Sequence, residues 1–232
     1  MYLYETHLHT SPLSACAKAS VRENLEFYKS AGYAGVFLTD HFINANINKE
    51  LRELPYEEKI KAYFRVYEEA KPIAEEIGIS VFSGLEMGCL GIDFLVYGVG
   101  ADWFIERSEM ETMNTSELLS LLMSDGALVI QAHPFREASY IDHIELFPRC
   151  IHGVEIFNGG MGELQNAMAA QFCRNYGLIP FAGSDNHTAG RRAVFGGMAT
   201  ERPIESVEDF ISMVKGGEAK PFIKDEDGIR FI

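Results

Sequence analysis

Residues 127–134 read Ala-Leu-Val-Ile-Gln-Ala-His-Pro, an apolar run that leads to a histidine. The same order occurs twice more: Val36-Phe37-Leu38 leads to Thr39-Asp40-His41, and residues 179–183 lead to Ser184-Asp185-Asn186-His187. Continuous apolar runs are typical of strands buried on both faces, which belong to parallel sheets covered by helices. Barrel enzymes keep their functional side chains at the carboxyl ends of such strands. The pattern therefore predicts an α/β fold with a site at that edge.

The histidines are concentrated at these strand ends. Five of the seven fall in four short clusters, at His7 and His9, at His41, at His133 and at His187. The spacing of His7 and His9 puts both imidazoles on one face of an extended strand, where one metal can bind both. Imidazole and carboxylate are good ligands for Zn²⁺, Mn²⁺ and Fe²⁺. Any one histidine could instead be a satisfied buried or capping residue, but four clusters at equivalent positions favour a multi-metal site.

Helical and extended patterns alternate along the rest of the chain. Helices are expected at residues 21–31, 56–77, 115–124 and 164–176, and Pro72 is expected to kink or break the second. Further strands are expected at residues 79–84, 94–99 and 153–158. The organisation is that of repeated βα units, with about seven strands in all.

Five motifs, in order along the chain, resemble the PHP (polymerase and histidinol phosphatase) family of metallohydrolases. They are His7-Leu8-His9-Thr10, Thr39-Asp40-His41, Gly84-Leu85-Glu86, Ala132-His133-Pro134 and Gly183-Ser184-Asp185-Asn186-His187. The resemblance implies a distorted (β/α)7 TIM-like barrel and a single domain over residues 1–232. It also implies two or three divalent metal ions, with zinc, manganese and iron all open.

The resemblance implies a ligand set for each of the first two metals. The first would be held by His7, His9, Glu86 and Asp185. Glu86 would bridge to a second metal that His133 also binds, since a carboxylate can join two cations about 3.5–4 Å apart. The family usually adds a further histidine, but Asp93 stands at the matching position of this sequence. As a harder donor, Asp93 would tilt the preference toward manganese or iron.

A third metal is implied at His41 and His187. The family's usual acidic or histidine ligand after the first motif is missing, and Cys16, reached by a shift of one residue, is the candidate replacement. A thiolate is an excellent zinc ligand. The alternative is that Cys16 is a small buried hydrophobe, which would leave two metals.

Three residues are candidates for binding substrate. Arg136 and Arg192 follow ligand motifs, so either could clasp phosphate oxygens, although solvation at the surface is the commoner fate of a lone arginine. Arg191 adjoins the second of them. Asn158 lies in a strand that resembles a family stretch near the barrel mouth, with structural hydrogen bonding as the alternative. The loop with Asn44, Asn46 and Asn48 is expected to border the pocket.

Composition supports this interpretation. The formal net charge of −14 argues against a nucleic-acid surface, and metals at the ligand cluster would offset part of it. The four cysteines show no disulfide or Cys-x-x-Cys pattern, and no leader or membrane-spanning run is seen, so a cytoplasmic protein is expected. The oligomeric state is left open.

The expected activity is hydrolysis of a small phosphate monoester at a di- or trinuclear centre. The residues expected to act in catalysis are Glu86, His41 and His187, the two histidines as proton donors if no third metal is present. Three alternatives remain. They are a phosphodiesterase or nuclease of the same family, a protein-tyrosine phosphatase, and a metal-binding regulatory module without catalysis.

Overall fold

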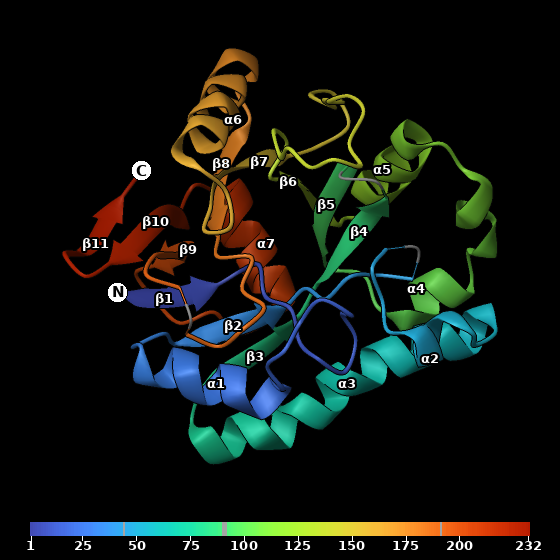
Figure 1. The fold of residues 1–232 in the computed structure, drawn as a ribbon, viewed down its shortest axis with the longest axis horizontal. Helices are drawn as coiled ribbons and strands as arrows, with labels where there is room; N and C mark the ends of the chain where they lie inside the picture. Colours follow the sequence, from blue (N-terminus) through green and yellow to red (C-terminus); the bar gives the residue numbers. More distant parts are fainter. Residues whose placement is uncertain (44, 90–91, 191) are drawn as a thin grey trace.

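The computed structural model describes residues 1–43, 45–89, 92–190 and 192–232 (Figure 1). These residues form strands with the bounds β1 Tyr2–Glu5, β2 Gly35–Leu38, β3 Ser80–Ser83, β4 Leu85–Cys89, β5 Ile92–Tyr97, β6 Leu128–Ala132, β7 Gly153–Asn158, β8 Ile179–Gly183, β9 Phe195–Thr200, β10 Lys220–Asp225 and β11 Gly228–Phe231. Each apolar run that preceded a histidine motif is a strand, as predicted.

The four predicted helices, which are α1, α3, α5 and α6, lie close to their expected ranges, and the other helices were not predicted. Their bounds are α1 Val21–Ser30, α2 Lys49–Arg52, α3 Tyr56–Ile77, α4 Ala101–Ile105, α5 Thr115–Ser124, α6 Glu163–Tyr176 and α7 Val207–Lys215, with a 3₁₀ helix over Ser108–Thr112. Helix α5 is capped by Asn114, whose side chain accepts the N–H of Glu117 while Glu117 reaches back to the cap.

Pro72 does not break α3. The helix continues through it to Ile77 and ends at Gly78, whose φ of 76° is the left-handed conformation common after a helix. Proline removes one backbone hydrogen bond. Burial of Tyr63, Ala70 and Ala74 against the sheet side of the helix holds it in place on both sides of that gap.

The strands form two sheets rather than one closed barrel. The six-stranded sheet has the order β11-β10-β9-β1-β2-β3, and the five-stranded sheet has the order β4-β5-β6-β7-β8. Two isolated parallel bridges join the sheets, His41 to Glu86 and Leu8 to Asn186. The expected mixed α/β fold is therefore present, with its strands in two sheets that meet at the residues carrying the ligand motifs.

Strand β5 departs from the expected βα alternation. It pairs antiparallel with both β4 and β6, so β3, β4 and β5 follow one another without a helix between them. The register places Gly88 opposite Asp93. A Cβ atom on Gly88 would lie 2.3 Å from Oδ1 of Asp93, so glycine at this position leaves the room that the carboxylate occupies.

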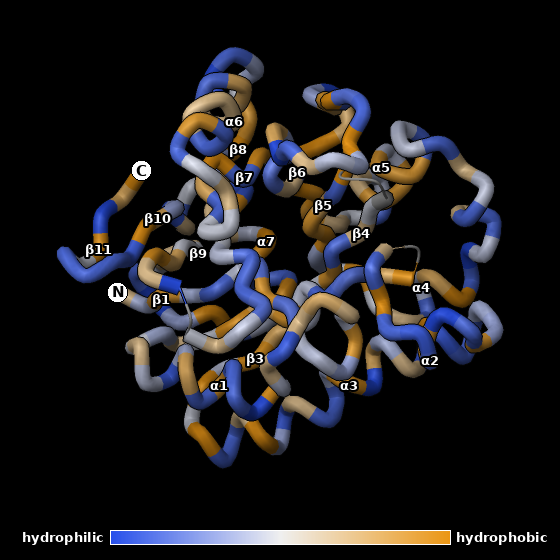
Figure 2. Tube along the Cα trace, viewed as in Figure 1, coloured by the Kyte–Doolittle hydropathy of each residue, from blue (hydrophilic) through white to orange (hydrophobic). Residues whose placement is uncertain are grey.

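Apolar side chains fill the space between sheets and helices. Figure 2 shows apolar residues concentrated on the central strands and on the inner sides of the helices. Helices α1 and α3 lie side by side on the six-stranded sheet, packed against β2 and β3 (Figure 1). No helix among the described residues is long and apolar enough to cross a membrane.

Candidate metal centre

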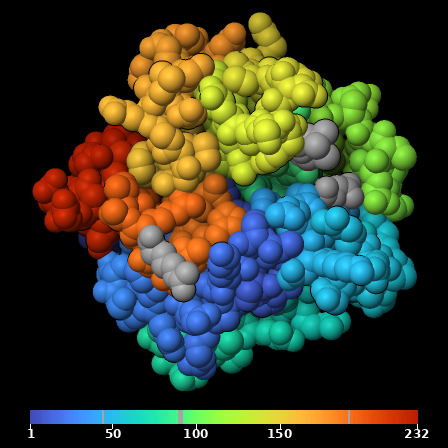
Figure 3. All heavy atoms as spheres, in the orientation of Figure 1, coloured from blue at the N-terminus to red at the C-terminus, as the bar shows by residue number. Residues whose placement is uncertain are grey.

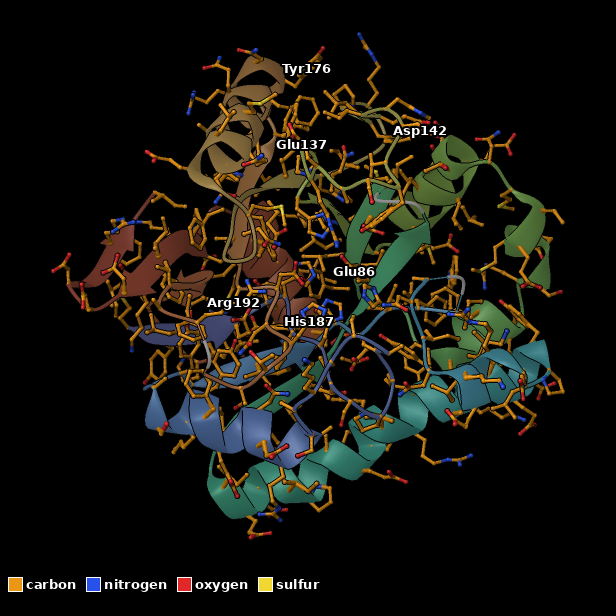
Figure 4. The ribbon with its side chains drawn as sticks, in the orientation of Figure 1. Glu86, Glu137, Asp142, Tyr176, His187 and Arg192 are labelled. Atoms are coloured by element: carbon orange, nitrogen blue, oxygen red, sulfur yellow. The ribbon has the colours of Figure 1, made fainter. Side chains whose placement is uncertain are left out.

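The predicted ligands come together where the two sheets meet. They follow or end strands on both sheets: His7 and His9 follow β1, His41 follows β2, Glu86 lies on β4, His133 follows β6, and Asp185 and His187 follow β8. Figure 4 shows Glu86 and His187 near the centre of the molecule between the sheets. The carboxyl ends of β1, β2, β6 and β8 thus deliver the histidines and Asp185 to one place, as the sequence predicted, while Glu86 comes from near the start of β4.

Among the described residues, three groups of side chains each bring their donor atoms within 4.8 Å of one another. The groups are His7, His9 and Asp185; His7, Glu86 and His133; and His9, His41 and His187. His7 belongs to the first two groups and His9 to the first and third. The arrangement offers three adjoining positions for cations, each with at least two imidazoles.

Glu86 lies between these groups. Its Oε1 is 3.3 Å from Nε2 of His7 and 3.0 Å from Nε2 of His133, while its Oε2 is 2.7 Å from Nδ1 of His41 and 3.5 Å from Nε2 of His9. Burial opposes ionisation of Glu86, but the charges of His41 and His7 lower its pKa well below the ordinary value. The carboxylate can therefore serve two neighbouring cations.

Two of the ligands sit on unusual backbone. His133 has a φ of 25° and Asp185 a φ of 51°, both in a region that residues other than glycine rarely adopt. Such conformations persist only where surrounding contacts fix them, and they cluster at functional sites. Here each one turns a strand end so that its side chain reaches the donor cluster.

The histidines are held by their second ring nitrogens. Nδ1 of His7 lies 2.9 Å from Oε1 of Glu155, Nδ1 of His9 lies 3.1 Å from Oγ of Ser14, and Nδ1 of His187 lies 3.0 Å from the carbonyl oxygen of Asp185. A metal-bound histidine typically donates its other N–H to such an acceptor, which fixes the tautomer. With the N–H at Nδ1, the Nε2 atoms would face the cluster as donors to a cation, and those of His7 and His9 lie 3.1 Å apart there.

The buried charges fit bound cations. Six carboxylates are buried: Glu5, Asp40, Glu86, Asp93, Glu155 and Asp185. Among the described residues no lysine or arginine is buried with them. Buried charge is costly unless it is paired, so the neighbouring histidines and bound divalent cations are the sources of positive charge that fit these carboxylates.

Three buried polar atoms in the cluster make no hydrogen bond with the described residues. Nδ1 of His41 and Oε2 of Glu86 approach each other closely without hydrogen-bond geometry; a third unpartnered atom, Nδ1 of His133, lies on another ring of the cluster. A nitrogen and an oxygen directed at one region in this way are the donors that a cation between them would use. The donor set therefore fits divalent metal ions.

Asp93 and Cys16 lie beside the cluster but belong to none of the three groups. Burial, followed by the charge of Glu86, raises the pKa of Asp93 to about 6. Burial also opposes ionisation of Cys16, but hydrogen bonds with His187 and His41 outweigh it and lower the pKa of the thiol to about 6. Both side chains line the adjoining cavity, so their roles as ligands stay predictions.

A cavity of about 470 Å³ opens directly onto the cluster. Arg136 and Arg192 line it from different loops, together with Tyr140 and Asn46. The guanidinium of Arg136 lies 6.0 Å from the ring centre of Tyr140, and Nη1 of Arg192 donates to the carbonyl of Ser184 at 2.8 Å. In Figure 3 the dark blue, yellow and orange segments that border the cavity meet near the centre of the face.

Asn158 has a different position from the two arginines. It is fully buried, its Nδ2 donates to Glu155 at 2.8 Å, and its Oδ1 accepts the N–H of Gly160 at 2.7 Å. These contacts are the structural hydrogen bonding that the sequence left open. Asn48 donates to the carbonyl of Ser11 at 2.7 Å, while Asn44 and Arg191 lie outside the described residues.

Three residues of the site were missed by sequence reasoning. Ser14 accepts the backbone N–H of His41 at 3.0 Å and donates to Asp40 at 2.6 Å, which connects two ligand segments. Glu5 and Tyr28 form a second buried network behind His7. A serine, a strand-end glutamate and a helical tyrosine give no local signal of this role.

Comparisons with known proteins agree with the fold. No family model and no curated protein matches the sequence. Among solved structures, the chain resembles a two-domain protein of Bacteroides vulgatus that contains a predicted PHP-like metal-dependent phosphoesterase, with a TM-score of 0.69 and 15% identity. The match covers 95% of this chain and 64% of that one, so the chain spans less than two thirds of that relative.

Two further structures are similar. One is a predicted metal-dependent phosphoesterase of Bifidobacterium adolescentis. Its TM-score is 0.54 at 16% identity, and the match covers 81% of this chain and 88% of that one. The other is an amidohydrolase of Chromobacterium violaceum with bound sulfate and no metal, with a TM-score of 0.53 and 13% identity over 82% and 89% of the two chains. The chain thus has the fold of PHP-like metal-dependent phosphoesterases, which confirms the family expectation at the level of structure.

Proposed function

We propose that this protein is a metal-dependent phosphoesterase that hydrolyses small phosphate monoesters. The observation that carries the proposal is the set of three adjoining donor groups, which meet around Glu86 and open onto a cavity with two arginines. We also propose that the two bridges between the sheets complete the distorted seven-unit barrel. Relatives with this fold are named as phosphoesterases, which supports the same activity.

The first two metal positions have the most complete donor sets. His7, His9 and Asp185 would hold one divalent ion, and Glu86 with His133 would hold the next. His7 belongs to both donor groups and lies between the two positions. A third ion would bind His9, His41 and His187, with Cys16 as the added ligand. Zinc, manganese and iron all suit mixed imidazole and carboxylate donors.

The chain's own residues define the reaction geometry. Bound divalent ions would neutralise charge on the phosphoryl oxygens and acidify water at the site. Arg136 and Arg192 would bind the non-bridging oxygens and orient the phosphorus toward the cluster. Where no third ion is bound, His187, whose Nδ1 is engaged by a carbonyl, presents Nε2 toward the cluster, and with His41 it can hold the proton that the departing alkoxide requires.

The dimensions of the cavity favour a small ester. A volume of about 470 Å³ lies within the range of small-molecule sites, roughly 300–1,000 Å³. The net charge of −14 disfavours a long polyanionic strand. These features favour a monoesterase over the phosphodiesterase or nuclease alternative.

Turnover of p-nitrophenyl phosphate tests this function. Protein freed of metal and reloaded with Zn²⁺, Mn²⁺ or Fe²⁺ should release phosphate, and a chelator should abolish the release. Glu86→Gln should lose at least about 100-fold of the activity, since the variant can no longer bridge two cations as a carboxylate. The same change at exposed Glu75 on α3 is the matched control and should leave activity unchanged. Metal binding without turnover of any phosphate ester would refute the proposal.

A further inference from the structure

Glu5 is a buried carboxylate that the proposed chemistry does not use. It ends β1, two residues before His7, and its side chain is fully buried. It belongs to none of the three donor groups among the described residues. Its four hydrogen bonds instead connect the two chain segments that supply the first metal position.

The first oxygen of Glu5 gathers three backbone donors. Its Oε1 accepts the N–H of Thr6 at 2.9 Å, of His7 at 2.8 Å and of Ser184 at 3.0 Å. The first two donors lie in the segment that carries the opening histidines, and the third directly precedes Asp185. One oxygen atom therefore holds both ligand segments, which are 179 residues apart in sequence.

The second oxygen of Glu5 makes a further connection to the same segment. Its Oε2 accepts the hydroxyl of Tyr28 at 2.7 Å, and that hydroxyl accepts Nδ2 of Asn186 at 3.1 Å. Asn186 is the residue after Asp185, and its backbone N–H donates to the carbonyl of His7 at 3.3 Å. Glu5 thus fixes the residues on both sides of Asp185.

The ligand atoms that depend on this connection lie close together. Oδ1 of Asp185 is 3.3 Å from Nε2 of His9 and 3.6 Å from Nε2 of His7. Asp185 keeps a φ of 51°, which the adjoining hydrogen bonds must maintain. We propose that Glu5 is a positioning residue that holds these two segments at the separation one divalent cation needs, and this rests on the proposed metal-dependent function.

The role requires a carboxylate rather than an amide of equal size. Glutamine could still accept backbone N–H groups at one oxygen, but its NH₂ would face the hydroxyl of Tyr28. That hydroxyl already accepts Asn186 and needs an acceptor for its own proton. Glu5→Gln therefore keeps the volume of the side chain but disrupts the link to the Asp185 segment.

Metal affinity of the whole chain tests the proposal without relying on turnover. Metal-free wild type and Glu5→Gln are titrated with Co²⁺ against a chromophoric chelator, and the urea unfolding of each metal-free protein is measured alongside. Leu119→Ala is the control, because Leu119 is buried on α5 in the core and lies in no donor group or ligand segment. We expect Glu5→Gln to bind one equivalent of Co²⁺ about 10- to 100-fold more weakly, as is usual when a partner of metal ligands is lost.

The control separates positioning from stability. Leu119→Ala should unfold at lower urea than wild type yet bind Co²⁺ with wild-type affinity. Wild-type affinity in Glu5→Gln would overturn the proposal while leaving the phosphoesterase function intact, whereas a wild type that binds no Co²⁺ would refute that function itself. If Glu5→Gln does not fold, Tyr28→Phe takes its place. It should lower the affinity for the same equivalent of Co²⁺ about 3- to 10-fold, because one hydrogen bond is lost. Unchanged Co²⁺ affinity in Tyr28→Phe would overturn the proposal.

Discussion

The thiol of Cys16 gives a direct test of the third donor group. In metal-free protein, hydrogen bonds with His187 and His41 overcome the effect of burial and lower the pKa of Cys16 from 9.0 to about 6. At pH 7 a thiol of pKa 6 is about 90% thiolate, whereas one of pKa 9 is about 1% thiolate. The fraction of reactive thiolate is therefore roughly 90-fold higher.

Lower basicity offsets part of this gain. With a Brønsted coefficient of about 0.4–0.5, a thiolate three pKa units less basic reacts about 16- to 32-fold more slowly. We therefore expect iodoacetamide to alkylate Cys16 about 3- to 6-fold faster at pH 7 than an accessible thiol of pKa 9. The more distinctive result is the pH profile, whose midpoint should lie near 6.

Mass spectrometry of the Cys16 peptide follows this reaction separately from the other cysteines. His187→Ala removes one hydrogen-bond partner, so the midpoint should move toward higher pH. Folding lowers the pKa of the Cys16 thiol. The thiolate therefore contributes to stability above the pKa that the thiol has in the unfolded chain, and this contribution is lost as the pH falls through about 6. Loading with Zn²⁺ should protect the thiol if it is the third ligand. A midpoint near 8.5 in metal-free wild type would refute the reasoning.

Three other changes have definite expected results. Glu155→Gln should weaken metal binding about 10- to 100-fold in a chelator competition, since it accepts Nδ1 of a ligand histidine, and equal affinities would contradict that role. Arg136→Ala should raise KM for an aryl phosphate about 10-fold or more, the value of one charged hydrogen bond, and an unchanged KM would place the phosphate elsewhere. Gly88→Ala should lower the free energy of unfolding in urea by about 1–3 kcal/mol, because its Cβ would lie 2.3 Å from the carboxylate of Asp93. At Gly100 a Cβ meets nothing within 4 Å, so Gly100→Ala should lose less, and an equal loss would contradict the steric argument.

The ligand-bearing strands could be predicted because their signal is local. In β2 and β6 a fully buried apolar run is followed at once by polar donors, and β8, buried from Phe181 to Gly183, has the same order; both halves of the pattern lie within about ten residues. The structure places His41, His133 and His187 where this order predicts. The pattern does not say which metal ion each donor group binds, so that assignment stays a proposal.

The sheet arrangement could not be predicted in the same way. Whether β5 runs parallel or antiparallel to β6 depends on pairing partners, and an apolar strand has the same composition in either direction. Strand β4 ends at Cys89 and β5 begins at Ile92, a separation too short for a parallel crossover, but this is evident only once the bounds of the strands are known. The break considered at Pro72 does not occur, since the local cost of proline is outweighed by tertiary packing on either side.

The net charge of the sequence predicted buried acids at the site better than the position of each acid along the chain did. Glu5 ends a strand, and a glutamate there normally faces solvent, so only the complete fold shows that it lies inside. The net charge of −14 was nevertheless expected to be concentrated partly at the metal cluster, and the six buried carboxylates are consistent with that. Without buried lysine or arginine partners, these interior acids rely on the neighbouring histidines or on bound cations for positive charge. The charge of the sequence and the geometry of the histidines therefore support the same conclusion: this centre gathers carboxylates and imidazoles around one place, and the stability of the protein should rise when divalent ions bind there.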